Sequence, residues 1–165
     1  IDLFDKIDLR VCEIVKAQEI RKSHSCLKLT LNDGSGENRV IVSSIKSDYT
    51  CEQLTGKKII VVANLEPARF SGVESNGMLL AASDPDTPED QETCEVLFAP
   101  QFEPGTILEP EGFSVPEEEL CYVKPDKFFE MPLKTVNGIV EVDGHKIGAD
   151  GKYLEAHTYV NGNVG

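Results

Sequence analysis

The chain of 165 residues is long enough for one domain, or for one domain with a small companion. Its hydrophobic content of 40% and charged content of 27% indicate a globular protein, and no apolar run approaches the roughly 20 residues that span a bilayer. The net charge of −13 argues against nucleic-acid binding by the chain as a whole, because phosphate neutralisation requires Lys and Arg.

Short strands separated by turns are predicted for the first half. Leu9–Ala17 is a mixed apolar run, and Leu27–Leu31 alternates strictly between apolar and polar residues. Asn32–Gly36 is a cluster of turn residues, and the β-branched segment Arg39–Val42 follows it as a return strand.

A short helix and two further strands complete this half. Thr50 and Gln53 have the spacing of a capping box, and Gly56 is a helix stop. Strands are predicted over Lys57–Leu65 and Gly77–Ala82. Five strands with one helix between the third and fourth match the order of an oligonucleotide-binding (OB) barrel, so the predicted fold class is all-β.

The second half is predicted to be a smaller β-rich unit that depends on the first for its core. Residues 83–94 are acidic and contain prolines, which indicates a connector or an exposed loop insertion. We therefore expect domains at residues 1–98 and 99–165. The elements expected after the acidic stretch are strands at Glu95–Phe98 and Thr106–Leu108, a helix around Phe128, Phe129 and Met131, and a hairpin over Gly138–Ile147 that turns at Asp143-Gly144.

Residues for catalysis or metal binding are sparse. Five scattered cysteines without a C-x-x-C pair argue against zinc and against a disulfide framework, so we expect them to be reduced, as in a cytoplasmic protein. His24, His145 and His157 are not spaced as a metal pair, and no phosphate-binding or dinucleotide-binding glycine motif is present. The sequence predicts no catalytic residue, no metal and no cofactor.

Candidate binding residues lie in the first half. Residues 1–82 hold 11 basic and 11 acidic residues, whereas residues 83–165 hold 5 and 18, so the acidic excess lies in the second half. Phe70 can stack on a base and Met78 can pack against a sugar or base, with core packing as the alternative for both. The predicted RNA-binding residues are Arg21, Lys22, Lys28, Arg39, Ser43, Lys57, Asn64, Arg69, Ser75, Asn76 and Met78. The alternative for the Arg and Lys residues among them is that they are ordinary surface charges. We expect Arg39 and Arg69 to be exposed.

Two segments resemble the tRNA-binding domain family, which includes endothelial monocyte-activating polypeptide II, the tails of some methionyl-, tyrosyl- and lysyl-tRNA synthetases, and the yeast synthetase cofactor. They are Arg39–Ile45 and Asn64–Ala82, the latter with the pattern N-L-x-P…G-V-x-S-x-G-M-L-L-A. Ile7–Ile14 resembles the family's first strand. In the second half, Lys124–Glu130 and Val142–Gly144 resemble the polypeptide II-like subdomain, which implies a monomer with an internal pseudo-dimer interface.

The chain also departs from the family pattern. Arg21–Ser25 replaces the usual His-Pro-x-Ala-Asp, and the basic N-L-K-P-x-K-M-R-G loop has Glu66 and Ala68–Ser71 in its place. The resemblance implies a non-catalytic, structure-directed tRNA-binding domain appended to a synthetase, first of all a methionyl-tRNA synthetase. Its partners would be tRNA, the catalytic domain in the same chain and proteins of a synthetase complex. A protein-interaction or cytokine-like module with weak RNA binding is the alternative.

Overall fold

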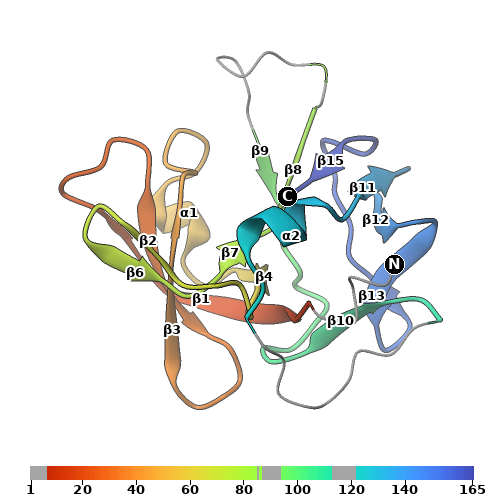
Figure 1. Ribbon diagram of the computed structural model, residues 1–165, viewed down its shortest axis with the longest axis horizontal. Coiled ribbons are helices and arrows are strands. Elements are labelled where there is room, and N and C mark those ends of the chain that lie inside the picture. The colour runs from red at the N-terminus through yellow and green to blue at the C-terminus, as the bar shows by residue number, and fades with distance from the viewer. Residues whose placement is uncertain (1–6, 85, 87–93, 113–121) are drawn as a thin grey trace.

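The computed structural model describes residues 7–84, 86, 94–112 and 122–165. Two β-rich units lie side by side along its long axis (Figure 1). The first half of the chain forms the unit coloured red to yellow, and the second half forms the unit coloured green to blue. Within the described residues, neither helix is both long enough and apolar enough to cross a membrane.

The first unit is a five-stranded antiparallel barrel, as predicted. Its strands pair in the order β3-β2-β1-β4-β7, and the short helix lies between the third and fourth strands in sequence. The barrel closes where Asn76 N donates to Val40 O at 2.8 Å and Val42 N donates to the Ser75 hydroxyl at 2.9 Å. Its elements are β1 (Leu9–Glu19), β2 (Leu27–Asn32), β3 (Asn38–Ser43), α1 (Cys51–Leu54), β4 (Lys58–Val62) and β7 (Met78–Leu79).

Strand β1 pairs with both β4 and β2, and it contains a bulge. Leu9–Glu13 pairs with β4, whereas Glu13–Glu19 pairs with β2, and the register with β2 shifts between Ile14 and Lys16. A bulge bends a strand and increases its twist. The extra residue, Val15, is 43% exposed although it lies in an apolar run.

Local sequence signals account for β2 and α1. In β2 the residues alternate between buried and partly exposed, with Leu27, Leu29 and Leu31 inside. At α1 the capping box is present: the Thr50 hydroxyl accepts from Gln53 N at 3.1 Å, and the Gln53 side chain accepts from Thr50 N at 2.8 Å. Both predictions are confirmed.

The segment between β4 and β7, predicted as a loop, contains a separate hairpin. Its strands are β5 (Ala68–Phe70) and β6 (Val73–Ser75), which form their own two-stranded sheet. The two turn residues, Ser71 and Gly72, have φ values of 51° and 83°, and positive φ at both positions is the mark of a type I′ turn. Three-residue strands are too short to give an alternation pattern, which is why the sequence predicted only a loop.

The predicted strand Gly77–Ala82 is divided at Leu80. Residues on either side form β7 and β8 (Ala81–Ser83), and β8 leaves the barrel to join the second unit. Leu80 N donates to Ile60 O while Leu80 O accepts from Leu97 N, so this residue bonds to both units. One apolar run therefore supplies strands to two units.

The second unit continues the sheet from β1 in the order β1-β10-β13-β12-β11-β15-β8-β9. Because β8 and β9 pair with each other, the acidic stretch connects the two strands of a hairpin; most of that stretch, residues 85 and 87–93, lies outside the described residues. The hairpin predicted at Asp143-Gly144 is confirmed by the β12–β13 pairing. The elements are β9 (Cys94–Val96), β10 (Ile107–Pro110), α2 (Pro125–Phe129), β11 (Leu133–Val136), β12 (Ile139–Val142), β13 (His145–Ala149), β14 (Lys152–Tyr153) and β15 (Asn163–Val164).

The two units share a core. In β1, Leu9 and Val11 pack with residues of the second unit such as Leu108 and Ile147, whereas Cys12 and Ile14 face the barrel interior. Strand β4 is likewise buried on both faces, which explains why its apolar run is continuous instead of alternating. The second unit therefore completes its core with side chains of the barrel, as expected from its small size.

Close backbone contact also joins the units at two glycines. A Cβ added to Gly34 would lie 2.7 Å from the Gly105 Cα, and both residues have positive φ, of 84° and 93°. Gly34 belongs to the turn between β2 and β3, and Gly105 lies just before β10. At this point, where the β2–β3 turn crosses the backbone before β10, only glycine fits without a shift of the backbone.

Candidate nucleic-acid interface

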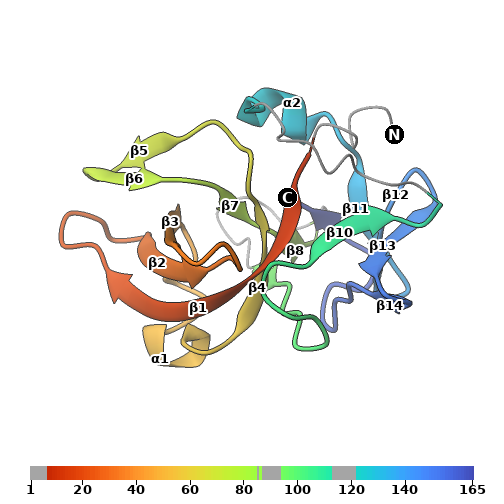
Figure 2. The same cartoon turned by 90° about the horizontal axis from the view of Figure 1, so that it is seen from below.

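Two segments project from the same end of the barrel. They are the turn between β1 and β2, at residues 20–26, and the β5–β6 hairpin, and both views of the ribbon place them next to each other (Figures 1 and 2). In OB barrels, oligonucleotides bind across strands 2 and 3 and the two loops that flank this face. The turn and the hairpin occupy the positions of those loops.

The β1–β2 turn presents two cations to solvent. Arg21 and Lys22 are both exposed, and neither makes an ion pair with a described residue. The Ser23 hydroxyl orders the turn by accepting from Ser25 N at 3.3 Å and from Cys26 N at 3.0 Å. The Ser23 hydroxyl holds the turn without help from Arg21 or Lys22, so the two charged side chains remain available.

A second pair of cations lies on the outward face of β1 and β2. Gln18 is directly opposite Lys28, and Lys16 is opposite Thr30, so Lys16 and Lys28 are diagonal neighbours on that face. Lys16 is exposed but is absent from the predicted site. The sequence alone placed Lys28 outward, whereas the position of Lys16 depends on the bulge at Val15, which cannot be located from one strand's pattern.

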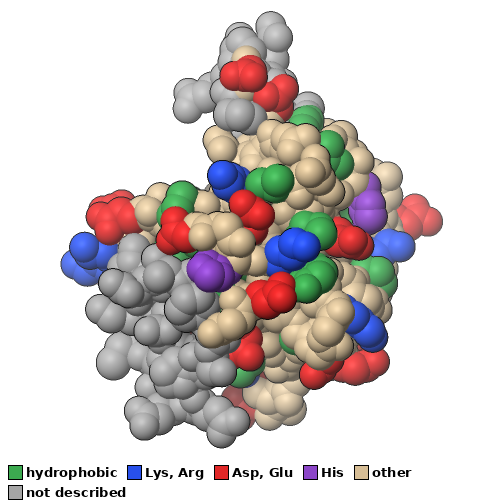
Figure 3. Space-filling view, turned by 90° about the vertical axis from the view of Figure 1, so that its right-hand side faces the viewer, with side chains coloured by type: hydrophobic (Ala, Val, Ile, Leu, Met, Phe, Trp, Pro, Cys, Tyr) green, Lys and Arg blue, Asp and Glu red, His purple; other side chains and the backbone are tan. Residues whose placement is uncertain are grey.

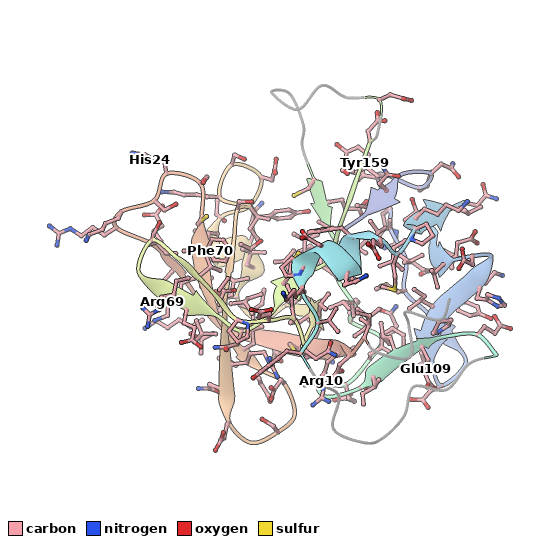
Figure 4. All side chains as sticks on the ribbon, in the orientation of Figure 1. Arg10, His24, Arg69, Phe70, Glu109 and Tyr159 are labelled. Carbon is pink, nitrogen blue, oxygen red and sulfur yellow. The ribbon has the colours of Figure 1, made fainter. Side chains whose placement is uncertain are left out.

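The hairpin carries an arginine and an aromatic ring at its tip. Arg69 (labelled in Figure 4) is exposed, and among the described residues its guanidinium makes a single hydrogen bond, a long one of 3.5 Å to Gly72 O. Phe70 is 46% exposed, and its ring contacts no other described aromatic ring. An exposed ring beside a guanidinium is suited to stacking on a nucleobase.

Arg39 is not the exposed cation that the sequence predicted. Its side chain is only 21% exposed, and its Nε donates to the Asp33 carboxylate at 3.0 Å. Its Nη1 donates to two backbone carbonyls, Ala63 O at 3.0 Å and Asn76 O at 2.7 Å. Burial alone would raise the pKa of Asp33, but hydrogen bonds from Ser35 and the guanidinium of Arg39 outweigh it and hold that pKa below its ordinary value.

Three of the predicted polar residues lie at the base of the hairpin and hold the backbone. Asn64 is 6% exposed, and its side-chain oxygen accepts from Asp8 N at 2.9 Å. Ser75 is 3% exposed; its hydroxyl accepts from Val42 N and donates to Gly77 O at 3.0 Å. Asn76 bonds through its backbone: its carbonyl oxygen accepts from Arg39, and its N–H donates to Val40 in β3. These contacts are therefore structural.

The remaining predicted residues lie apart from the projecting segments. Met78 packs against the shared core, which was the alternative considered for it. Lys57 is exposed but follows α1, which lies on the opposite side of the barrel from the hairpin (Figure 2). Ser43 is partly buried at the end of β3, opposite Leu27. The structure therefore brings together Arg21, Lys22, Lys28, Arg69 and Phe70, with Lys16 added.

Another kind of functional site would require metal ligands, a charged patch or a reactive thiol among the rest of the described residues. Among the described residues, no group of three or more His, Cys, Asp or Glu could hold a metal ion. Acidic and basic side chains are interspersed on the face of the second unit (Figure 3). Of the thiols described, those of Cys12, Cys26 and Cys51 are free, and the Cys94 thiol donates to the Asp48 carboxylate at 3.4 Å. Burial raises the pKa of Cys12 to about 12, so this thiol is protonated at neutral pH.

Similar sequences include methionyl-tRNA ligases. The chain is 44% identical over 108 residues to the enzyme of Archaeoglobus fulgidus and 54% identical over 84 residues to that of Methanocaldococcus jannaschii. These matches cover 64% and 51% of this chain but only 15% and 13% of the two relatives. The likeness is thus to one segment of a much longer protein.

Solved structures share the fold. The C-terminal domain of Plasmodium vivax p43 superimposes with a TM-score of 0.84 over 98% of both chains, at 20% identity. A protein related to methionyl-tRNA synthetase from Pyrococcus horikoshii superimposes with a TM-score of 0.57 at 36% identity, over 64% of this chain and 93% of that one. A family model described as a putative tRNA binding domain matches residues 9–106, from the start of β1 almost to β10. This chain belongs to the tRNA-binding domain family.

Proposed function

We propose that the chain is a non-catalytic tRNA-binding domain carried by an aminoacyl-tRNA synthetase, with methionyl-tRNA synthetase as the parent. One observation carries this proposal: a group of cations has no ion-pair partner among the described residues. Arg21, Lys22 and Arg69 lie on the two segments that project from one end of the barrel, and Lys16 and Lys28 lie on the outward face of β1 and β2, next to the β1–β2 turn. Similarity to a segment of methionyl-tRNA ligases supports the choice of parent.

Binding would follow the shape and backbone of the RNA. Lys and Arg contacts to phosphates position an RNA without reading its sequence. Phe70 adds a stacking surface for an unpaired base, and such stacking tolerates any base. The acidic excess lies in the other half of the chain and keeps phosphate to the barrel side, since repulsion acts over roughly 10 Å at 0.1 M salt.

The benefit to the parent enzyme would be a higher local concentration of tRNA. A weak binder tethered to a catalytic domain turns the second encounter into an intramolecular one. The domain would act in the cytoplasm and as a monomer, because the second unit already covers β1 and β4 on the face away from the barrel interior. Proteins of a synthetase complex are further partners in this proposal.

The proposal is tested by measuring tRNA binding at several salt concentrations. Replacing Arg21 and Lys22 by Glu should weaken binding by more than about ten-fold and reduce the slope of log affinity against log salt by about 2, one for each lost contact. A matched control replaces Lys134 and Lys152, two exposed lysines of the second unit, by Glu; it makes the same change of net charge and should alter binding far less.

Equal weakening in both variants would show that tRNA binding depends on net charge alone, and it would contradict the placement of the site at the β1–β2 turn. If the unsubstituted chain binds no tRNA even at low salt, the protein-interaction alternative becomes the better account. The acidic second unit favours that alternative, because it offers a surface for a basic protein partner.

A further inference from the structure

We infer that Arg39 is a positioning residue, whose guanidinium holds the β5–β6 hairpin in the orientation that presents Arg69 and Phe70 to RNA. This inference rests on the proposed function for its consequence, but its structural part stands on the contacts alone. It replaces the role in phosphate binding that the sequence predicted for Arg39.

The contacts place Arg39 at the point where the hairpin leaves the barrel and returns to it. Ala63 follows β4 directly, and Asn76 precedes Gly77 and β7. The carbonyl oxygens of both residues accept from the same nitrogen, Nη1 of Arg39, at 3.0 Å and 2.7 Å. A single guanidinium thus ties together both ends of the segment that contains the hairpin.

The hairpin needs such an anchor because its strands are not paired with the barrel. β5 and β6 form a separate two-stranded sheet, so no strand ladder fixes their direction relative to β3. Among the described residues, the other hydrogen bonds from β3 to this segment are those made by Ser75 and Asn76, on its returning side; on its outgoing side, Asn64 and Glu66 bond to the backbone of Val123. A lone two-stranded hairpin is marginally stable in water, so the contacts at its base decide its orientation.

Asp33 completes the anchor by orienting the guanidinium. Its carboxylate accepts from Arg39 Nε at 3.0 Å and from Ser35 N at 3.0 Å, and its side chain is only 6% exposed. The planar guanidinium can reach a carboxylate and two carbonyls at once, whereas the single ammonium of lysine cannot reproduce this fork. A lysine at position 39 would keep the charge and lose the geometry.

Two variants separate positioning from phosphate contact. Arg39→Lys keeps the positive charge, and Asp33→Asn keeps Arg39 while removing a nearby negative charge. If Arg39 contacts phosphate, the first variant should bind tRNA almost normally and the second should bind more tightly. If Arg39 positions the hairpin, both should bind about five-fold more weakly, because the residues at its tip lose their fixed geometry.

Limited digestion with trypsin supplies a readout that needs no RNA. Cleavage after Arg69 reports on the hairpin, and cleavage after Lys22 in the β1–β2 turn is an internal reference within the same molecule. In both variants the first cleavage should accelerate about ten-fold and the second should not change, as for a local opening. Arg10→Lys is the matched control, because Arg10 pairs with Asp8 in a similar half-buried ion pair and should leave both cleavages unchanged.

The inference would be overturned if Arg39→Lys and Asp33→Asn were cleaved after Arg69 at the same rate as the unsubstituted chain. Equal acceleration at both sites, which would indicate general destabilisation, would also overturn it, as would tighter tRNA binding by Asp33→Asn. If the parent chain binds no tRNA, the proposed function fails, while the cleavage rates still decide whether Arg39 anchors the hairpin.

Discussion

Glu95 in β9 anchors the C-terminal segment, and its removal should lower stability measurably. Its carboxylate accepts from three successive backbone N–H groups, those of His157 at 2.7 Å, Thr158 at 2.9 Å and Tyr159 at 3.0 Å. Each hydrogen bond to a charged group contributes about 1.5–3 kcal/mol when it is protected from water. His157 and Thr158 are exposed, so in a variant without the carboxylate, water would bond to their N–H groups and offset much of the lost stabilisation.

We therefore expect Glu95→Ala to cost about 2–3 kcal/mol in the free energy of unfolding. For a chain of this size that corresponds to a fall of roughly 4–12 °C in the thermal midpoint. Glu95→Gln retains an acceptor without the charge and should cost about half as much. Calorimetry or circular dichroism would measure both.

The control is Glu155→Ala. Glu155 is an exposed glutamate in the same region, no hydrogen bond of its side chain is described, and its replacement should change the free energy of unfolding by less than about 0.5 kcal/mol. If Glu95→Ala lowers the midpoint no more than this control does, the three hydrogen bonds do not stabilise the fold and the reasoning is refuted.

Two further predictions follow from the core and from the crossing of the two units. Because burial raises the pKa of Cys12 to about 12, the folded state keeps the thiol proton after the unfolded state has lost it; the free energy of unfolding should fall above about pH 9, by up to about 1.4 kcal/mol per pH unit until pH 12. Cys12→Ala should remove this part of the slope in denaturant titrations, and an unchanged slope would contradict the assignment. Gly34→Ala should cost about 1–3 kcal/mol more than Gly36→Ala, because both have positive φ but only Gly34 faces the Gly105 backbone; equal thermal midpoints would rule out the crossing.

Much of the fold was predictable because its signals are local. The alternation in Leu27–Leu31, the capping box at Thr50 and the Asp143-Gly144 turn each depend on residues within a few positions of one another, and each was confirmed. Arg21 and Lys22 were likewise correctly expected at the surface, since a turn between two strands of a barrel faces solvent. The Asn64–Ala82 pattern indicated the family that the comparisons confirm.

Tertiary structure alone decided which cations face solvent together. Lys16 lies beside Lys28 only because a bulge shifts the register of β1, and register is a property of two strands. Arg39 and Arg69 have the same side chain, yet one spans Asp33 and two carbonyls while the other extends into solvent. The sequence by itself determined the elements, their order and the family. It did not determine the role of Arg39, because the atoms that hold its guanidinium come from the β2–β3 turn, from the residue after β4 and from the residue after β6, and only the closed barrel brings these positions together.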